Sequence, residues 1–167
     1  MAGSPAPRER GRSGRGRDRE MGDETRTRGF RSLSHTADKA IEAWGPTLEE
    51  LCVAAAEGMF SESEDLASIP AMTEWGIELQ ADTREDLLRA WLAELLWLWE
   101  REEAVPCGFE VREVAQEPWR LSARVRGGPA PAESPHTGAP VKAVTYHDLH
   151  VWQDEEGVWR AHVVFDV

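Results

Sequence analysis

The sequence has 167 residues, a length that favours a single domain with a buried core, and a formal net charge of −12. No apolar run reaches the length of a membrane span and no segment resembles a signal peptide, so we expect a cytoplasmic protein without a membrane partner. Cys52 and Cys107 lack the spacing of a disulfide framework or a zinc site and are expected to be free thiols.

The charge is distributed unevenly along the chain. Residues 1–28 hold 8 arginines and 5 acidic residues, a net charge of +3, whereas the rest holds 11 lysines and arginines and 26 acidic residues, a net charge of −15. Nucleic-acid affinity comes largely from cationic contacts with phosphates, so we expect no stable RNA or DNA binding by this acidic body. A basic protein partner or a bound cation fits the charge better.

The first 28 residues have the composition of a disordered leader. Their opening, "MAGSPAPRERGRSGRGRDRE", is rich in Gly, Pro, Ser and Arg and cannot form a core. We therefore place a leader at 1–28 and one domain at 29–167. An arm that touches RNA is the alternative to an inert leader, and Met21 is a second candidate for the first residue.

The domain opens with strand-like segments and a helix. "FRSLSHTADKAIEAWG" reads as two short strand-like pieces, with the HTAD segment, residues 35–38, between or beside them. Thr47 and Glu50 have the spacing of a capping box and predict a helix whose apolar face ends near Phe60. "TEWGIELQA" predicts the next strand.

A second helix is expected from around Asp82 through "REDLLRAWLAELLWLWEREE". Its apolar stripe should make it the most buried helix, and consists of Leu87, Leu88, Trp91, Leu92, Leu95, Leu98 and Trp99. Glu94 lies at the edge of this stripe, where we expect it to reach solvent; a buried functional carboxylate is the alternative.

Everything after this helix has the pattern of β structure. "GFEVREVA", "WRLSARV", "VKAVTYHDLHVWQ" and "VWRAHVVFDV" are strand-like, with a Gly/Pro-rich loop before the third and a turn at "DEEG" before the fourth. Two main helices among many strands predict an α+β fold with a mixed or antiparallel sheet.

No catalytic constellation is visible, and we assign no catalytic residue. The chain lacks HExxH, paired CxxC, GxSxG, P-loop and GxGxxG motifs. His147 and His150 resemble a metal-binding pair, but residues three apart on a strand face opposite sides, which favours structural histidines.

Oxygen ligands remain as candidates for chemistry. The last strand alternates to the end of the sequence and leaves the Asp166 side chain and the Val167 carboxylate there, while Asp38 lies in a polar break near the start of the domain. If the first and last strands are neighbours, three oxygen groups converge, as Ca²⁺ or Mg²⁺ requires. A solvent-exposed strand edge is the alternative.

Four segments together resemble the archease family, in order, from about Gly29 to Val167. They are the HTAD segment with the helix after it, "LLRAWLAELLWLWE", "VKAVTYHDLHVW" and the terminal "FDV". The resemblance implies a small α+β protein that is no enzyme itself but a cofactor of the RtcB-type RNA ligase in tRNA splicing and RNA repair. It would promote the guanylylation of the ligase with GTP, which the ligase uses, and its multiple turnover.

The resemblance also implies a site. The family's metal ligands map onto Asp38, Asp166 and Val167, with Ca²⁺ or Mg²⁺/Mn²⁺ as the cation, while His35, Lys142 and His147 are candidates for nearby or partner-facing positions. The loop before "KAVTYH" departs from the family pattern: it begins Gly127-Gly128-Pro129 instead of Gly-Glu, with His136 as the plausible match to a family histidine.

Two other functions are alternatives to this one. A metal-dependent phosphoester hydrolase could use Asp38 and Asp166 directly. A simple RNA-binding module is disfavoured by the acidic body.

Overall fold

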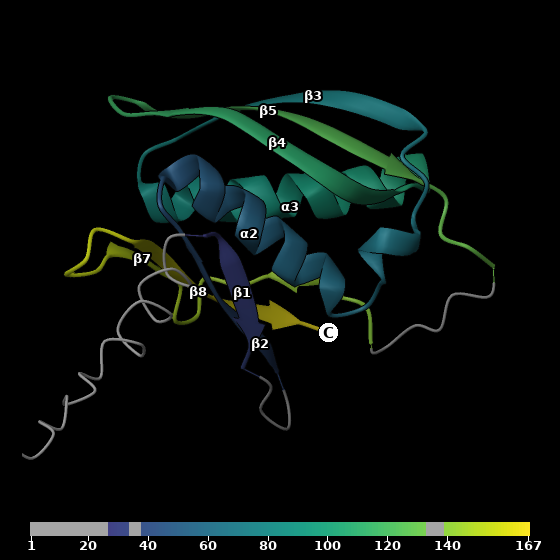
Figure 1. Ribbon diagram of the computed structural model, residues 1–167, viewed down its shortest axis with the longest axis horizontal. Coiled ribbons are helices and arrows are strands. Elements are labelled where there is room, and N and C mark those ends of the chain that lie inside the picture. The colour runs from purple at the N-terminus through teal and green to yellow at the C-terminus, as the bar shows by residue number, and fades with distance from the viewer. Residues whose placement is uncertain (1–26, 34–37, 133–138) are drawn as a thin grey trace, which may run out of the picture.

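Two antiparallel β-sheets enclose two α-helices, so the domain is built in three layers (Figure 1). The structure, a computed structural model, describes residues 27–33, 38–132 and 139–167. In chain order its elements are β1 (Gly29–Ser32), β2 (Lys39–Gly45), α2 (Leu48–Ser61), the short 3₁₀ helix η1 (Leu66–Ser68), β3 (Thr73–Ala81), α3 (Arg84–Glu102), β4 (Val105–Ala115), β5 (Trp119–Gly128), β6 (Ala143–Val144), β7 (His150–Gln153) and β8 (Trp159–Asp166). The expected α+β fold is confirmed.

Helix α2 begins where the capping box predicts. The Thr47 hydroxyl accepts a hydrogen bond from the Glu50 amide at 3.1 Å and so satisfies one of the free N–H groups of the first turn. The helix is buried on nearly all sides, including three consecutive alanines at 54–56, because it lies between the sheets (Figure 1). Small side chains let both sheets approach its axis closely.

Helix α3 begins at Arg84, close to the start expected around Asp82. Thr83 is the N-cap and its side chain accepts from the Asp86 amide at 3.1 Å. The predicted stripe is buried, with Leu96 in addition and Trp99 only partly covered. Glu94 is half-buried at the edge of the stripe.

The larger sheet places the first and last strands side by side. Its order is β1-β2-β8-β6, and β7 also pairs with β8, so β8 is central. The strand-like segment "VKAVTYHDLHVWQ" forms two short strands, β6 and β7, instead of one continuous strand. They are separated by a turn in which Asp148 adopts a left-handed conformation with φ of 49°.

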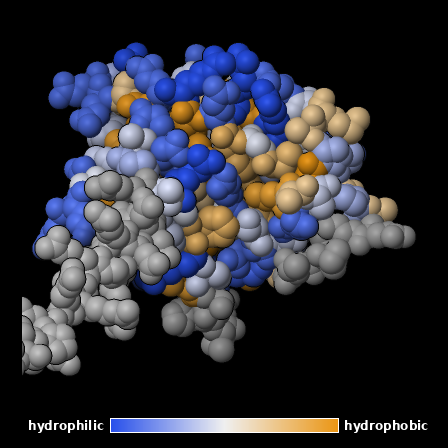
Figure 2. Space-filling view, in the orientation of Figure 1, coloured by the Kyte–Doolittle hydropathy of each residue, from blue (hydrophilic) through white to orange (hydrophobic). Residues whose placement is uncertain are grey.

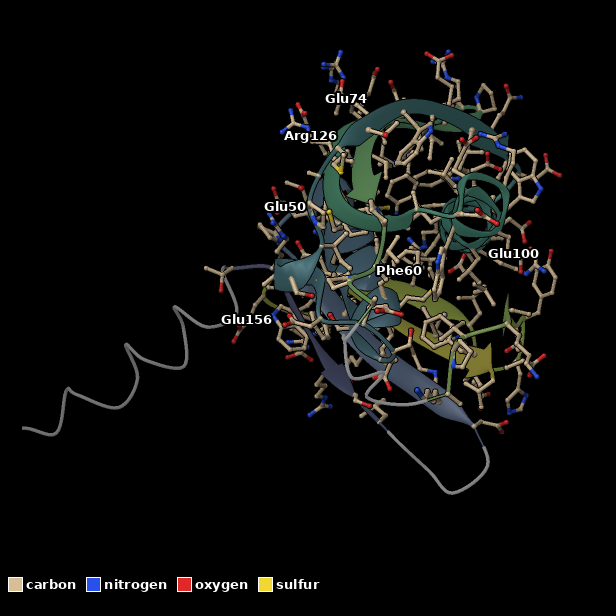
Figure 3. All side chains as sticks on the ribbon, turned by 90° about the vertical axis from the view of Figure 1, so that its right-hand side faces the viewer. Glu50, Phe60, Glu74, Glu100, Arg126 and Glu156 are labelled. Carbon is tan, nitrogen blue, oxygen red and sulfur yellow. The ribbon has the colours of Figure 1, made fainter. Side chains whose placement is uncertain are left out.

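The smaller sheet, in the order β3-β5-β4, turns a charged face to solvent. Arg124 and Arg126 of its central strand bind the Glu74 carboxylate at 3.1 Å and 3.0 Å. Figure 3 shows Glu74 beside Arg126 at this outer edge and Phe60 in the interior, and Figure 2 shows hydrophilic residues along the upper edge of the molecule. This face is a solvated surface of opposite charges.

The contacts of the domain begin just before the predicted boundary. Arg28, assigned to the leader, lies 2.8 Å from the Glu50 carboxylate and 3.2 Å from that of Glu57, both on α2. Most of the leader lies outside the described residues. None of the described helices is long and apolar enough to cross a membrane.

Trp91→Ala should lower the free energy of unfolding by about 3–5 kcal/mol, the usual loss when a large aromatic side chain leaves a core. Trp91 is fully buried and its indole N–H donates to the Cys52 carbonyl at 2.9 Å. Trp97→Ala is the matched control on the same helix, because that side chain is 49% exposed. Chemical denaturation that ranked the two in the other order would contradict the assignment of the buried face.

Deletion of residues 1–26 should shift the melting temperature by no more than a few degrees, because this segment has no aromatic or branched aliphatic side chain to add to the core. Deletion of residues 1–28 also removes the exposed Arg28 ion pairs and should cost only slightly more. A large loss after the shorter deletion would show that the leader packs on the domain.

Candidate functional site

The pairing of β2 with β8 brings the two predicted metal-binding aspartates to one edge of the larger sheet. The strands are antiparallel, with Ile41 opposite Val163 and Lys39 opposite Phe165. The pairing ends at Lys39 and Phe165; continued by one residue, this register would set Asp38 opposite Asp166, and directly opposite residues of an antiparallel pair have Cα atoms about 4.5–5.5 Å apart. Both aspartates are exposed to solvent.

Strand β6 closes the other side of Asp166. Ala143 lies opposite Asp166, and the Lys142 amide donates to the Asp166 carbonyl at 2.8 Å. The backbone of Asp166 is therefore held by β6, one residue beyond the last pair of β8 with β2, and Val167 follows it, 37% exposed. Figure 1 shows the C end of β8 beside the start of β2. We call Asp38, Asp166 and Val167 the carboxylate edge.

The chemistry of the carboxylate edge fits a hard cation. Its donors are carboxylate and main-chain oxygens, the ligands that Ca²⁺, Mg²⁺ and Mn²⁺ prefer. Across residues 27–33, 38–132 and 139–167, no cluster of three or more His, Cys, Asp or Glu side chains is placed to bind a metal. The carboxylate edge offers two such side chains, and the remaining oxygens belong to the main chain of Val167.

A groove adjoins the carboxylate edge. It has a volume of about 520 Å³ and lies between the C-terminal half of α3 and the residues that lead into β6. Its lining residues are Leu96, Trp99, Glu100, Glu103, Pro140, Val141 and Lys142. Glu100 is labelled in Figure 3, on the side of the molecule formed by α3. Lys142 lines this groove, and its backbone amide also donates to the Asp166 carbonyl, so the groove and the carboxylate edge are linked through this residue.

The two histidines singled out in the sequence, His147 and His150, lie in different parts of the segment 141–153. His147 lies in the turn after β6, with its Nε2 atom 3.2 Å from the Asp148 carboxylate, and it is exposed. His150 begins β7 opposite His162, whose Nδ1 atom is 2.8 Å from the Asp148 carbonyl oxygen. His35 and His136 lie outside the described residues.

Both cysteines are free thiols, as expected, and the surroundings of each one disfavour the nucleophilic thiolate form. Both are unpaired by disulfides. Burial raises the pKa of Cys52 to about 12, and it also raises the pKa of Cys107 above its ordinary value. The thiolate, which is the reactive form of cysteine, is therefore disfavoured at neutral pH.

The sequence interpretation missed Lys39, which follows Asp38 directly. A signal was present, because Lys39, Ile41 and Ala43 share the alternating set of β2 that faces the core. A lysine at a core-facing strand position is uncommon unless its ammonium group has fixed partners. In the structure those partners are backbone carbonyls of two separate segments, at Glu62 and at Ala139.

Comparison with known proteins agrees with the resemblance in the sequence. Residues 30–167 match the model of the Archease protein family. The chain is 34% identical over 139 residues to the protein archease of Methanopyrus kandleri, which covers 83% of this chain and 99% of that protein. It is 36% identical over 140 residues to the protein archease of Methanosarcina mazei, which covers 83% and 95%.

Solved structures show the same fold. The solution structure of protein 1598 of Methanobacterium thermoautotrophicum is similar with a TM-score of 0.72 and 30% identity, over 83% of this chain and 99% of that one. The crystal structure of an archease and possible chaperone from Thermotoga maritima is similar with a TM-score of 0.53 and 25% identity, over 82% and 96%. With the family model matched over residues 30–167, this chain belongs to the archease family.

Proposed function

We propose that this chain is an accessory protein of an RtcB-type RNA ligase, and that it promotes the guanylylation of the ligase and its multiple turnover through a divalent cation held at the carboxylate edge. Membership of the archease family supports the choice of an RtcB-type ligase as the partner. The observation that carries the proposal is the β2–β8 register, which ends at the Lys39–Phe165 pair and, continued by one residue, would set the exposed Asp38 opposite the exposed Asp166.

The ligands of the cation would be the Asp38 and Asp166 carboxylates and an oxygen of Val167. When bound, Ca²⁺, Mg²⁺ or Mn²⁺ supplies positive charge that stabilises phosphate oxygens during nucleotidyl transfer. Asp38 and Asp166 lie at the exposed end of the sheet and not in an enclosed pocket, so they can present this charge to another protein. In this proposal GTP is bound and used by the ligase and not by this chain.

The charge of the domain suits such a partner. A ligase that binds RNA needs a basic surface beside its active site, and an acidic protein is attracted to that surface. Residues 29–167 carry a net charge of −15. The chain would also favour a ligase conformation that is ready for guanylylation if it binds that conformation more tightly than others. This second effect fits the description of the Thermotoga maritima relative as a possible chaperone.

Asp166→Asn should raise the free energy of unfolding of the metal-free protein by roughly 0.2–1 kcal/mol, because like charges directly opposite each other destabilise a strand pair. High salt should reduce the difference by screening. Asp82→Asn is the matched control, since Asp82 is exposed and lies just before α3, away from β8's C-terminal end. Chemical denaturation of the three chains in a metal chelator measures the effect, and a loss of stability in Asp166→Asn alone would contradict close approach of the carboxylates.

Added to an RtcB-type ligase, the wild-type chain should increase the yield of the ligase–GMP adduct and permit several rounds of ligation. Transfer of radiolabel from GTP to the ligase measures the first effect directly. Asp38→Ala should lose most of the stimulation, whereas Asp82→Ala should retain it. An adduct rate that is the same with and without the wild-type chain would remove the proposed function.

The isolated chain should hydrolyse no phosphoester. Incubation with Mn²⁺ or Mg²⁺ and a chromogenic phosphodiester, in the absence of any ligase, distinguishes an accessory protein from a hydrolase. Turnover that disappears in both Asp38→Ala and Asp166→Ala would establish the hydrolase instead.

A further inference from the structure

Lys39, the first residue of β2, places a cation at a core-facing position. It lies opposite Phe165, which is fully buried, and only 18% of its own side chain is exposed. Removing an ammonium group from water is costly unless its N–H donors find partners. The hydrogen-bond partners of the Lys39 ammonium group therefore indicate which parts of the structure this side chain holds together.

The Lys39 ammonium donates hydrogen bonds to backbone carbonyls in two separate segments. One goes to Glu62, the C-cap of α2, at 3.0 Å, and the other goes to Ala139 at 2.9 Å. The Glu62 carboxylate is 3.9 Å from the same nitrogen. Helix α2 has no basic residue in its last turn, so Lys39 brings a cation to the negative end of the helix from a neighbouring strand.

The segment held at Ala139 leads directly to the carboxylate edge. Three residues later, the Lys142 amide donates to the Asp166 carbonyl at 2.8 Å, and Ala143 pairs with Asp166. The Lys39 ammonium thus fixes the start of this segment and the Lys142 amide fixes its end. Because Asp38 directly precedes Lys39, the same side chain also anchors the β2 side of the carboxylate edge.

We propose that Lys39 is a positioning residue for the carboxylate edge. Its ammonium group ties β2, the end of α2 and residues 139–142 together, so that Asp38, Asp166 and Val167 are held in place to bind a divalent cation. This inference rests on the proposed function, which supplies the cation. The competing role is a purely electrostatic one, in which a nearby positive charge only weakens cation binding.

Lys39→Met separates these two roles, because they predict opposite changes in the affinity for a divalent cation. Loss of a positive charge alone would tighten the binding of a cation. Loss of positioning should instead raise the Kd for Mn²⁺ roughly 10-fold or more, because residues that orient metal ligands typically contribute 10–100-fold to affinity. Calorimetric titration of Mn²⁺ into the isolated chain measures the change. Lys39→Arg, which keeps the charge and the donors, should retain most of the affinity.

Arg160→Met is the matched control for general destabilisation. Arg160 is also a partly buried cation on this sheet, with 23% of its side chain exposed, but it lies near the start of β8. It binds the carboxylates of Asp154 at 2.8 Å and Glu42 at 3.0 Å, and its hydrogen bond to Asp154 holds the pKa of that carboxyl below its ordinary value. Arg160→Met should lower the melting temperature and leave the Kd for Mn²⁺ unchanged.

Hydrogen exchange provides a second readout. Exchange at the Lys142 amide should be faster in Lys39→Met than in the wild type and unaffected in Arg160→Met. If Lys39→Met does not fold, Lys39→Gln replaces it, because glutamine retains hydrogen-bond donors without the charge, and an increased Kd is again expected.

Tighter or unchanged Mn²⁺ binding in the folded Lys39 variant would overturn the positioning role and leave the proposed function standing. An equal loss of affinity in Arg160→Met would overturn it as well, since general destabilisation would then explain the effect. Absence of Mn²⁺, Mg²⁺ and Ca²⁺ binding by the wild-type chain would overturn both the cation-based function and this inference.

Discussion

The antiparallel pairing of β2 with β8 is the interaction on which the rest of the structure depends. It joins the first and last parts of the domain and makes β8 the central strand, with β6 and β7 on its other side. Its register is determined by burial, because Ile41, Val163 and Phe165 face the core and are fully buried. A slip of one residue would expose these side chains and turn Asp166 inward. The position of the carboxylate edge is therefore a consequence of how the core packs.

The two helices strengthen this constraint because they are covered from both sides. Alanines 54–56 of α2 are fully buried between the sheets, and Trp91 of α3 binds the backbone of α2 through Cys52. A core enclosed in this way leaves few alternative arrangements for β2 and β8. The proposed function then depends on the end of the sheet, where the side chains of Asp38 and Asp166 are exposed. In the proposed function, a site of this kind would present its ligands outward to a partner protein.

Local signals in the sequence predicted the elements well, and their failures have physical causes. Thr47 was identified as the cap of α2 because its hydroxyl binds the backbone three residues further along the chain. At the start of α3, Asp82 and Thr83 are both good capping residues, and only the structure shows that Thr83 is the N-cap. The strand-like segment 141–153 is interrupted by a turn with a left-handed Asp148, which the pattern of residue types did not reveal. From the sequence, Asp38 and Asp166 could be placed together only if the first and last strands were neighbours, because spacing along a chain contains no information on strand order. Lys39 was missed because its partners are carbonyls, which every residue possesses.

The central claim is that the carboxylate edge binds a divalent cation, and calorimetric titration with Ca²⁺, Mg²⁺ and Mn²⁺ tests it most directly. The comparison uses the wild-type chain, Asp38→Ala, and a chain extended by a short Gly/Ser tail after Val167. The account predicts binding by the wild type and a sharp loss in Asp38→Ala. The extended chain should bind weakly if the Val167 carboxylate is the ligand and normally if its carbonyl is. Equal affinity in the wild type and Asp38→Ala, or no binding by either, would contradict the account.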